Sequence, residues 1–126
     1  MSTVFKTVAP YADDAMNLPV EDLERAIPYY EKTFGFRVVS RQDSPHRSVI
    51  LERDTIRIGL AENGGDPSQE GCFFGVENIE AAFEEINGVP PTESAFRIDK
   101  FNGVPYRVFF VVAPDGLCYM LGERQQ

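Results

Sequence analysis

Two arginines are the residues of this sequence whose type and spacing could do chemistry. Arg57 lies in the segment 55–61 and Arg107 in the segment 106–113, and each alternates with three apolar residues. Side chains of a strand point alternately to its two faces, so both guanidiniums would lie opposite an apolar face. An inward guanidinium needs a carboxylate, either from the protein, such as Glu52, or from a ligand. We therefore expect either internal ion pairs or a site for a small anion.

The sequence offers little for metal or covalent chemistry. His46 is the only histidine, and neither Cys72 nor Cys118 lies in a spacing that would hold zinc. We find no phosphate-binding glycine loop and no serine-nucleophile motif. Both thiols are expected to be free, and the simplest interpretation of His46 is a solvent-facing residue at a strand end.

Composition narrows the possible partners. The chain has 126 residues, 43% of them hydrophobic, and a formal net charge of −8, which is typical of one globular domain. An acidic chain without a basic cluster repels nucleic acid and acidic lipid surfaces. The start MSTVFKTVAP resembles no secretory leader, and no apolar run is long enough to cross a bilayer. We expect a cytoplasmic protein without nucleic-acid or membrane partners.

An internal repeat organises the chain. Residues 18–27 align without gaps on residues 74–83, with four identities. In each copy an extended segment turns into a helix, and Asp22 and Asn78 are placed to cap the two helices. After the caps the apolar residues follow a helical period, as in Leu23, Ala26 and Ile27 of the first copy. The repeat therefore predicts two equivalent strand-to-helix units.

Strand-like segments follow each expected helix. They cover 36–41, 45–53 and 55–61 in the first half, and 95–99, 106–113 and 117–122 in the second. The last strands also match, because residues 58–62 align on residues 119–123 in the repeat register. This predicts an α+β fold of two tandem βαβββ modules, about 12–62 and 71–123, within one domain spanning residues 1–126.

Two longer motifs resemble a known family. The run LPVEDLERAIPYYEKTFGF and the run VVAPDGLCYMLGE are similar to the opening helix and the closing hairpin of the glyoxalase, bleomycin-resistance and extradiol dioxygenase proteins, the vicinal oxygen chelate superfamily. The resemblance implies a cupped, mostly antiparallel eight-stranded sheet with the helices outside. A small molecule would bind in the cup. The fold alone does not fix the activity, since it carries isomerases, dioxygenases and pure binding proteins.

The resemblance also implies where a metal ion would be held. The four ligand positions of the metal-dependent members fall at Ala15, Gly59, Gly71 and Met120. None of these side chains is a suitable donor for a divalent catalytic ion. A one-residue shift would bring in Asp14 or a glutamate at a strand end, but it would also turn core residues toward solvent. We therefore expect no metal and no other cofactor.

Alternation assigns residues to the cup. In 106–113 it places Val108, Phe110 and Val112 in the core and Arg107 and Phe109 inside the cup. It also places Cys118 inside and Cys72 in the core. The residues expected to bind the ligand are Asn17, His46, Ser48, Arg57, Phe73, Arg107, Phe109, Cys118 and Met120.

Three functions remain open. The first is metal-independent binding, as for sequestration or resistance, of a small anionic or aromatic molecule, as in the bleomycin-resistance proteins that the chain resembles. In those binders a homodimer completes the cavity, and open sheet edges are a physical reason to pair. The second is a metal-dependent lyase, isomerase or dioxygenase. The third is an interaction module whose cup is filled by its own Phe73, Phe109 and Met120.

Overall fold

The structure is a computed structural model that describes residues 3–10 and 15–125. The expected start of the first module near residue 12, and Asp14, lie outside the described residues. The elements in chain order are β1 (Phe5–Pro10), β2 (Leu18–Pro19), α1 (Leu23–Thr33), β3 (Arg37–Gln42), β4 (Ser48–Arg53), β5 (Ile56–Ala61), η1 (Pro67–Gln69), β6 (Gly71–Val76), α2 (Ile79–Asn87), η2 (Glu93–Ala95), β7 (Arg97–Phe101), β8 (Val104–Val112) and β9 (Cys118–Arg124).

The two βαβββ modules predicted from the repeat are confirmed. In each module the first strand pairs in parallel with the last strand, β2 with β5 and β6 with β9. The registers agree as well. Leu18 lies opposite Leu60 in the first module, and Phe74 lies opposite Leu121 in the second. Aligned residues of the repeat therefore occupy equivalent positions in space.

The sheet differs from the expected single sheet of eight strands. In the described part of the chain, nine strands form two sheets, one of five strands in the order β1-β6-β9-β8-β7 and one of four in the order β2-β5-β4-β3. The ninth strand is β1, which pairs antiparallel with β6 of the second module. No pattern in the sequence predicted a strand in this segment. Each module instead builds its own sheet, and β1 extends the five-stranded one.

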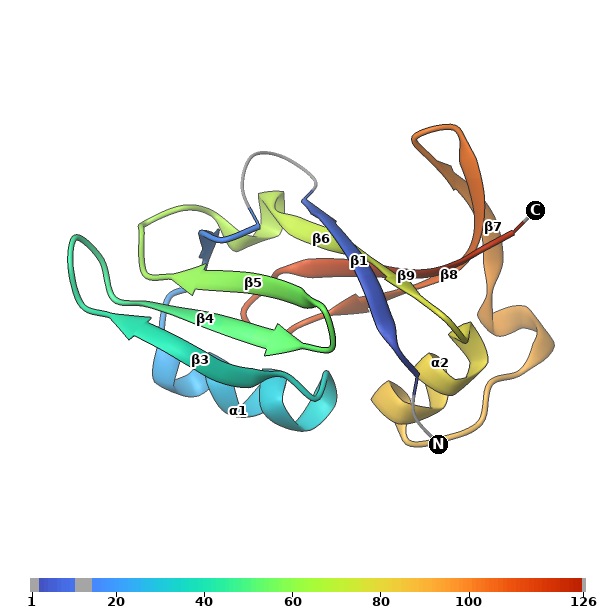
Figure 1. Ribbon diagram of the computed structural model, residues 1–126, viewed down its shortest axis with the longest axis horizontal. Helices are drawn as coiled ribbons and strands as arrows, with labels where there is room; N and C mark the ends of the chain where they lie inside the picture. Colours follow the sequence, from blue (N-terminus) through green and yellow to red (C-terminus); the bar gives the residue numbers. More distant parts are fainter. Residues whose placement is uncertain (1–2, 11–14, 126) are drawn as a thin grey trace.

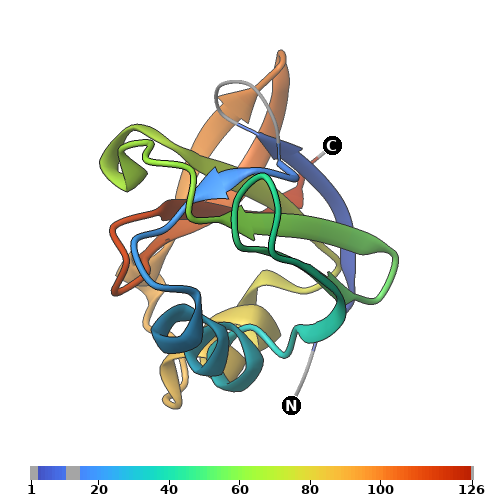
Figure 2. The same ribbon diagram turned by 90° about the vertical axis from the view of Figure 1, so that its left-hand side faces the viewer.

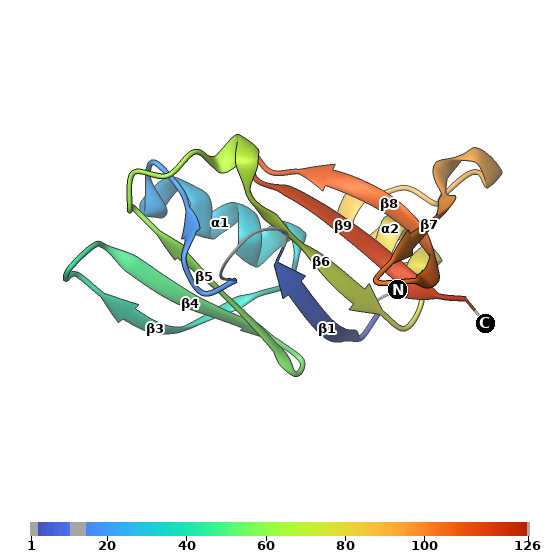
Figure 3. The same cartoon turned by 90° about the horizontal axis from the view of Figure 1, so that it is seen from above.

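Both helices lie on the same side of the two sheets (Figures 1 and 2). The main core fills the space between them, and it includes Tyr30 from α1, Ile79 from α2 and Tyr119 from β9. The opposite faces of the sheets are turned away from the helices, as the view from above shows (Figure 3). We call these two surfaces together the open face.

The helix ends follow the expected chemistry. The Asp22 side chain accepts hydrogen bonds from the backbone N–H groups of Glu24 and Arg25, and Asn78 accepts one from Ala81. Gly88 ends α2 at a φ of 76°, a left-handed conformation that favours glycine. None of the described helices is long and apolar enough to span a membrane.

Candidate functional site

The open face of the four-stranded sheet carries a charged triplet. Arg37, Glu52 and Arg57 lie directly opposite one another across β3, β4 and β5. The Glu52 carboxylate accepts from Arg37 Nη2 at 2.6 Å and from Arg57 Nε at 2.9 Å. Hydrogen bonds from Arg57 and then from Arg37 lower the pKa of the Glu52 carboxyl. Two guanidiniums share one carboxylate, so the triplet keeps one net positive charge.

Arg57 therefore lies on the expected face and has an internal partner. The sequence left two partners open for this arginine, a carboxylate of the protein and a carboxylate of a ligand, and Glu52 is the first of these. The Arg57 side chain nevertheless remains 58% exposed, while that of Glu52 is 17% exposed. Its outer N–H groups face solvent, where an anion can approach.

Asn17 and Ser48 come together at the other end of this sheet. With Met16, Gln42, Ile50 and neighbouring residues they line a small cavity of about 210 Å³. His46 does not lie in a strand, because β4 begins only at Ser48, and its side chain is exposed in the loop before it. The cavity is about large enough for a few waters or a small polar group.

The open face of the five-stranded sheet is aromatic. Phe73 and Met120 lie opposite each other on β6 and β9, and they pack with Val108. The ring of Phe101 stacks on Phe73 with centroids 4.6 Å apart, and Tyr106 meets Phe73 edge-on at 4.8 Å. Phe73 is consequently only 2% exposed.

The two thiols lie on opposite faces of the five-stranded sheet, as expected. Cys72 is in the main core, where burial raises the pKa of its thiol to about 12. Cys118 precedes Met120 by two residues on β9 and is half-buried, and burial also raises the pKa of its thiol. Both thiols are free.

The predicted faces of β8 are wrong. Phe109 packs edge-on against Phe83 of α2 at 5.1 Å, so it lies on the helix side. Arg107 pairs with Glu80 of α2 at 3.4 Å and lies over the ring of Phe96 at 4.4 Å. Neither side chain is on the open face. The physical reason is that both faces of this strand are apolar, so alternation could not identify the helix-covered one.

A metal ion does not fit the positions where the family resemblance places its ligands. The Gly59 N–H donates to the Ala15 carbonyl at 2.7 Å. A Cβ atom on Gly59 would lie 2.0 Å from the carbonyl oxygen of Met16, so no donor side chain can project from this position. Met120 packs in the apolar cluster and offers only a thioether. Within residues 3–10 and 15–125, no three His, Cys, Asp or Glu side chains converge as metal ligands do.

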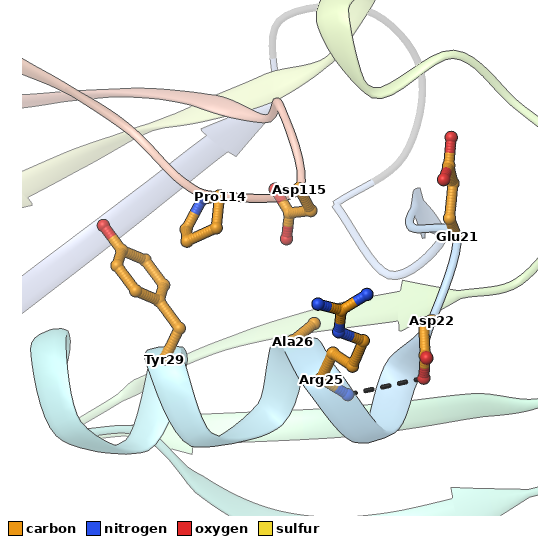
Figure 4. Close-up of a pocket in the computed structure, with 7 residues that line it drawn as sticks. All are labelled: Glu21, Asp22, Arg25, Ala26, Tyr29, Pro114 and Asp115. Atoms are coloured by element: carbon orange, nitrogen blue, oxygen red, sulfur yellow. Dashed lines mark hydrogen bonds between the residues drawn. The ribbon is translucent and has the colours of Figure 1, made fainter.

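A second cavity lies beside α1, away from the charged triplet and the aromatic cluster. It measures about 450 Å³ and is lined by Glu21, Asp22, Arg25, Ala26, Tyr29, Pro114 and Asp115. Figure 4 shows the Arg25 side chain pointing toward the turn formed by Pro114 and Asp115. None of the nine residues predicted to bind ligand lines this cavity.

A hydrogen-bond chain that no sequence pattern predicted underlies this second cavity. The Tyr30 hydroxyl donates to Asp115 Oδ2 at 3.0 Å and lies 2.7 Å from the Tyr119 hydroxyl. Burial raises the pKa of Asp115 above its usual value, and it raises the pKa of both tyrosines. The sequence does offer one indication of this hydrogen-bond chain, because a tyrosine on the buried face of a helix needs a hydrogen-bond partner for its hydroxyl. Its partner could not be identified without the fold.

Comparison with known proteins gives the family. The model described as the Glyoxalase/Bleomycin resistance protein/Dioxygenase superfamily matches residues 12–89. The chain therefore belongs to this superfamily, as its motifs predicted. No curated protein sequence matches the chain.

Solved structures share the fold. A protein from the mobile metagenome of V. Pseudocholerae aligns with a TM-score of 0.68 at 20% identity, covering 91% of this chain and 95% of that chain. A bleomycin resistance determinant encoded on transposon Tn5 aligns with a TM-score of 0.61 at 24% identity, covering 91% of this chain and 100% of that chain. Glyoxalase I from Zea mays aligns at 0.58 and 22% identity, covering 89% of this chain but 47% of that chain. At these identities the likeness establishes the architecture.

Proposed function

We propose that this protein binds a small anionic molecule with an aromatic body on its open face, without a metal ion. One observation carries the proposal. Arg37 and Arg57 share the single carboxylate of Glu52, so the four-stranded sheet presents an uncompensated guanidinium to solvent. Arginine binds carboxylate and phosphate groups through paired hydrogen bonds, which makes it suited to an anionic ligand.

The aromatic half of the site comes from the other sheet. Phe73, Tyr106 and Met120 belong to an apolar cluster on this face, whose lining suits a ring rather than a charged group. Burial of such a ring supplies affinity, and the arginines supply the preference for an anion.

We further propose that two copies of the chain complete the cup. Phe110 and Val112 continue the aromatic face along β8, and they are 45% and 65% exposed. An apolar surface of this kind is stabilised when another surface covers it. The proposal pairs the aromatic face of one copy with the charged face of its partner. The free thiols fit the reducing environment of the cytoplasm, which is the proposed location.

The metal-dependent enzyme is the weaker candidate. Ala15, Gly59 and Gly71 provide no donor atoms in their side chains, and the Met16 backbone occupies the space beside Gly59. Lyase, isomerase and dioxygenase reactions of the metal-dependent relatives need an ion with several His or carboxylate ligands. The residues that the structure describes supply no such set.

The test compares aromatic acids with their neutral amides. We expect calorimetry to show tighter binding of phenylacetate and 1-naphthoate than of the matching amides. One lost charge-assisted contact corresponds to about 1.5–3 kcal/mol, so Arg57→Gln should weaken acid binding about tenfold or more. The matched control is Arg41→Gln, because Arg41 and Arg47 share Glu24 as Arg57 and Arg37 share Glu52.

Two results would overturn the proposal. One is equal affinity for acids and amides. The other is an equal effect of Arg57→Gln and Arg41→Gln, which would assign the loss to general charge rather than to the open face. Native mass spectrometry of the freshly purified protein reads subunit number, bound metal and retained ligand in the same measurement.

A further inference from the structure

The aromatic cluster on the open face contains a ring from a different part of the fold. Phe73 comes from the middle of β6, whereas Phe101 is the last residue of β7, at the tip of the β7–β8 hairpin. The two rings are almost parallel, at an interplanar angle of 16°, with centroids 4.6 Å apart. Phe101 therefore covers Phe73 as a planar aromatic molecule would.

The hairpin tip extends beyond the paired sheet. Strand pairing between β8 and β9 begins at Tyr106. One further backbone hydrogen bond, from the Gln125 N–H to the Pro105 carbonyl, lies next to this pair on the side of the tip. Asn102 and Gly103 form the turn, with φ values of 53° and 80°. No heavy atom lies within 4 Å of the place where a Gly103 Cβ would be, so the turn is open to solvent.

The edge position of β7 leaves the tip with few backbone partners. Among the strands that the structure describes, β7 pairs only with β8, and it forms the edge of the five-stranded sheet. Displacing Phe101 from Phe73 would therefore disturb the last β7–β8 pair, Phe101 with Val104, and not the pairing of β8 with β9. Local opening of such a segment costs far less than global unfolding.

We propose that Phe101 occupies the subsite that takes the aromatic ring of the ligand, and that the hairpin tip is a lid displaced on binding. The inference rests on the proposed function, whose ligand carries an aromatic body. The floor of the subsite is Phe73, its side is Tyr106, and Val108 and Met120 complete its apolar lining. A flat ring system fits this subsite, and a branched aliphatic group does not replace the stacking.

Self-occupation lowers the apparent affinity. A ligand that requires the open state binds more weakly by the fraction of molecules in which that state is populated. Phe101→Ala removes the competing ring and leaves the hairpin backbone intact. We expect this variant to bind aromatic acids about tenfold more tightly than the unmodified protein.

The experiment uses 1-naphthoate, 1-naphthamide and the fluorescent probe 1-anilinonaphthalene-8-sulfonate with the full chain. The matched control is Ile98→Ala, because Ile98 lies on the same hairpin, is 60% exposed, and pairs with Arg107 on the opposite face. Phe101→Leu keeps an apolar side chain without the ring and should give an intermediate affinity. Urea unfolding of each variant establishes that it is folded.

A second measurement reports the lid itself. Lys100 is exposed beside Phe101, so trypsin cleavage after Lys100 follows opening of the tip. Saturating 1-naphthoate should accelerate this cleavage in the unmodified protein, because the ligand ring replaces Phe101. Protection by the ligand would overturn the lid.

The outcomes separate the two proposals. Affinity that depends on Arg57 but does not change in Phe101→Ala would overturn the lid and leave the proposed function standing. Equal tightening for 1-naphthoate and 1-naphthamide in Phe101→Ala, without any effect of Arg57→Gln, would support the aromatic subsite and overturn the preference for anions. Failure of all three probes to bind either form would overturn both.

Discussion

Arg53 of β4 forms a two-point ion pair with Glu85 of α2, and this pair joins the two modules. Arg53 Nη1 contacts Glu85 Oε2, and Arg53 Nη2 lies 3.0 Å from Glu85 Oε1. The same guanidinium donates to the carbonyls of Phe34 at 2.7 Å and Thr3 at 2.8 Å, and it lies over the Phe5 ring at 4.3 Å. The Arg53 side chain is only 11% exposed. One cation therefore holds together both modules and the N-terminal segment.

Replacement of this arginine should destabilise the protein strongly. Arg53→Met leaves the Glu85 carboxylate and two carbonyls without their donor, so we expect a loss of about 3 kcal/mol in the free energy of unfolding. Arg41→Met breaks an exposed pair with Glu24 and should cost less than about 1 kcal/mol. Urea unfolding measures both values. Equal losses would show that the Arg53–Glu85 pair contributes no more to stability than an exposed ion pair does.

The tyrosine chain has a central member, Tyr30, that mutations can reveal. The single hydroxyl proton of Tyr30 is donated to Asp115, so the Tyr119 hydroxyl must donate to Tyr30. Tyr30→Phe removes both hydrogen bonds and should cost about 2–3 kcal/mol, whereas Tyr119→Phe removes one and should cost about 1 kcal/mol. Thermal or urea unfolding tests the order. A larger loss for Tyr119→Phe would show that Tyr30 is not the central member of the chain.

Asp115 should make stability depend on pH in the direction opposite to most acids. Burial raises its pKa in the folded protein above the ordinary value of 3.8. The folded state therefore holds this proton more tightly than the unfolded chain. Its contribution to stability is complete below pH 3.8 and is lost as the pH rises through the raised pKa.

The test of this pH dependence is the variant Asp115→Asn, which cannot ionise. As the pH rises from 3.8 through the raised pKa of Asp115, the unmodified protein should lose stability relative to the variant. The substitution also alters hydrogen bonds, but this changes the free energy of unfolding by a constant amount and leaves its dependence on pH unaffected. Parallel stability curves over the same interval would contradict the prediction.

Gly59 should tolerate no side chain. The Met16 carbonyl oxygen lies 2.0 Å from the position of an added Cβ, and it belongs to the backbone, so Gly59→Ala must displace the segment that crosses this strand. We expect a loss of about 3 kcal/mol, comparable to overpacking a core. Gly64→Ala serves as the comparison, since nothing lies within 4 Å of its Cβ and only its φ of 81° is unfavourable, at about 1 kcal/mol. Similar losses in the two variants would show that the Met16 segment yields easily.

The sequence predicted the modules because each has strong local signals. Asp22 and Asn78 mark the starts of the helices, and the repeat places the parallel strand pairs in register. The segment Phe5–Pro10 carries no such signal. It becomes a strand through pairing with β6, more than sixty residues later in the chain, and only the folded sheet supplies that partner.

The site was predicted only in part for a related reason. Phe73, Met120 and Arg57 were placed on the correct face. Arg57 alternates with Ile56, Ile58 and Leu60, which gives its strand one polar and one apolar face, and Met120 occupies a ligand position implied by the family resemblance. Arg107 and Phe109 were placed on the wrong face. The face they occupy is decided by Phe83 and Glu80 of α2, which are distant in sequence. The importance of Arg37 and Phe101 was missed as well, since both act through neighbours on other strands.

The free edges of the two sheets bear on how the protein behaves at high concentration. β3 ends the four-stranded sheet and carries Arg37 and Arg41 together with an irregularity between Val38 and Ser40. β7 ends the five-stranded sheet and carries Arg97 and Lys100. Charged side chains and bulges on edge strands discourage the open-ended strand addition that leads to fibrils. Copies of this chain should therefore resist amyloid-like stacking at these two edges during folding.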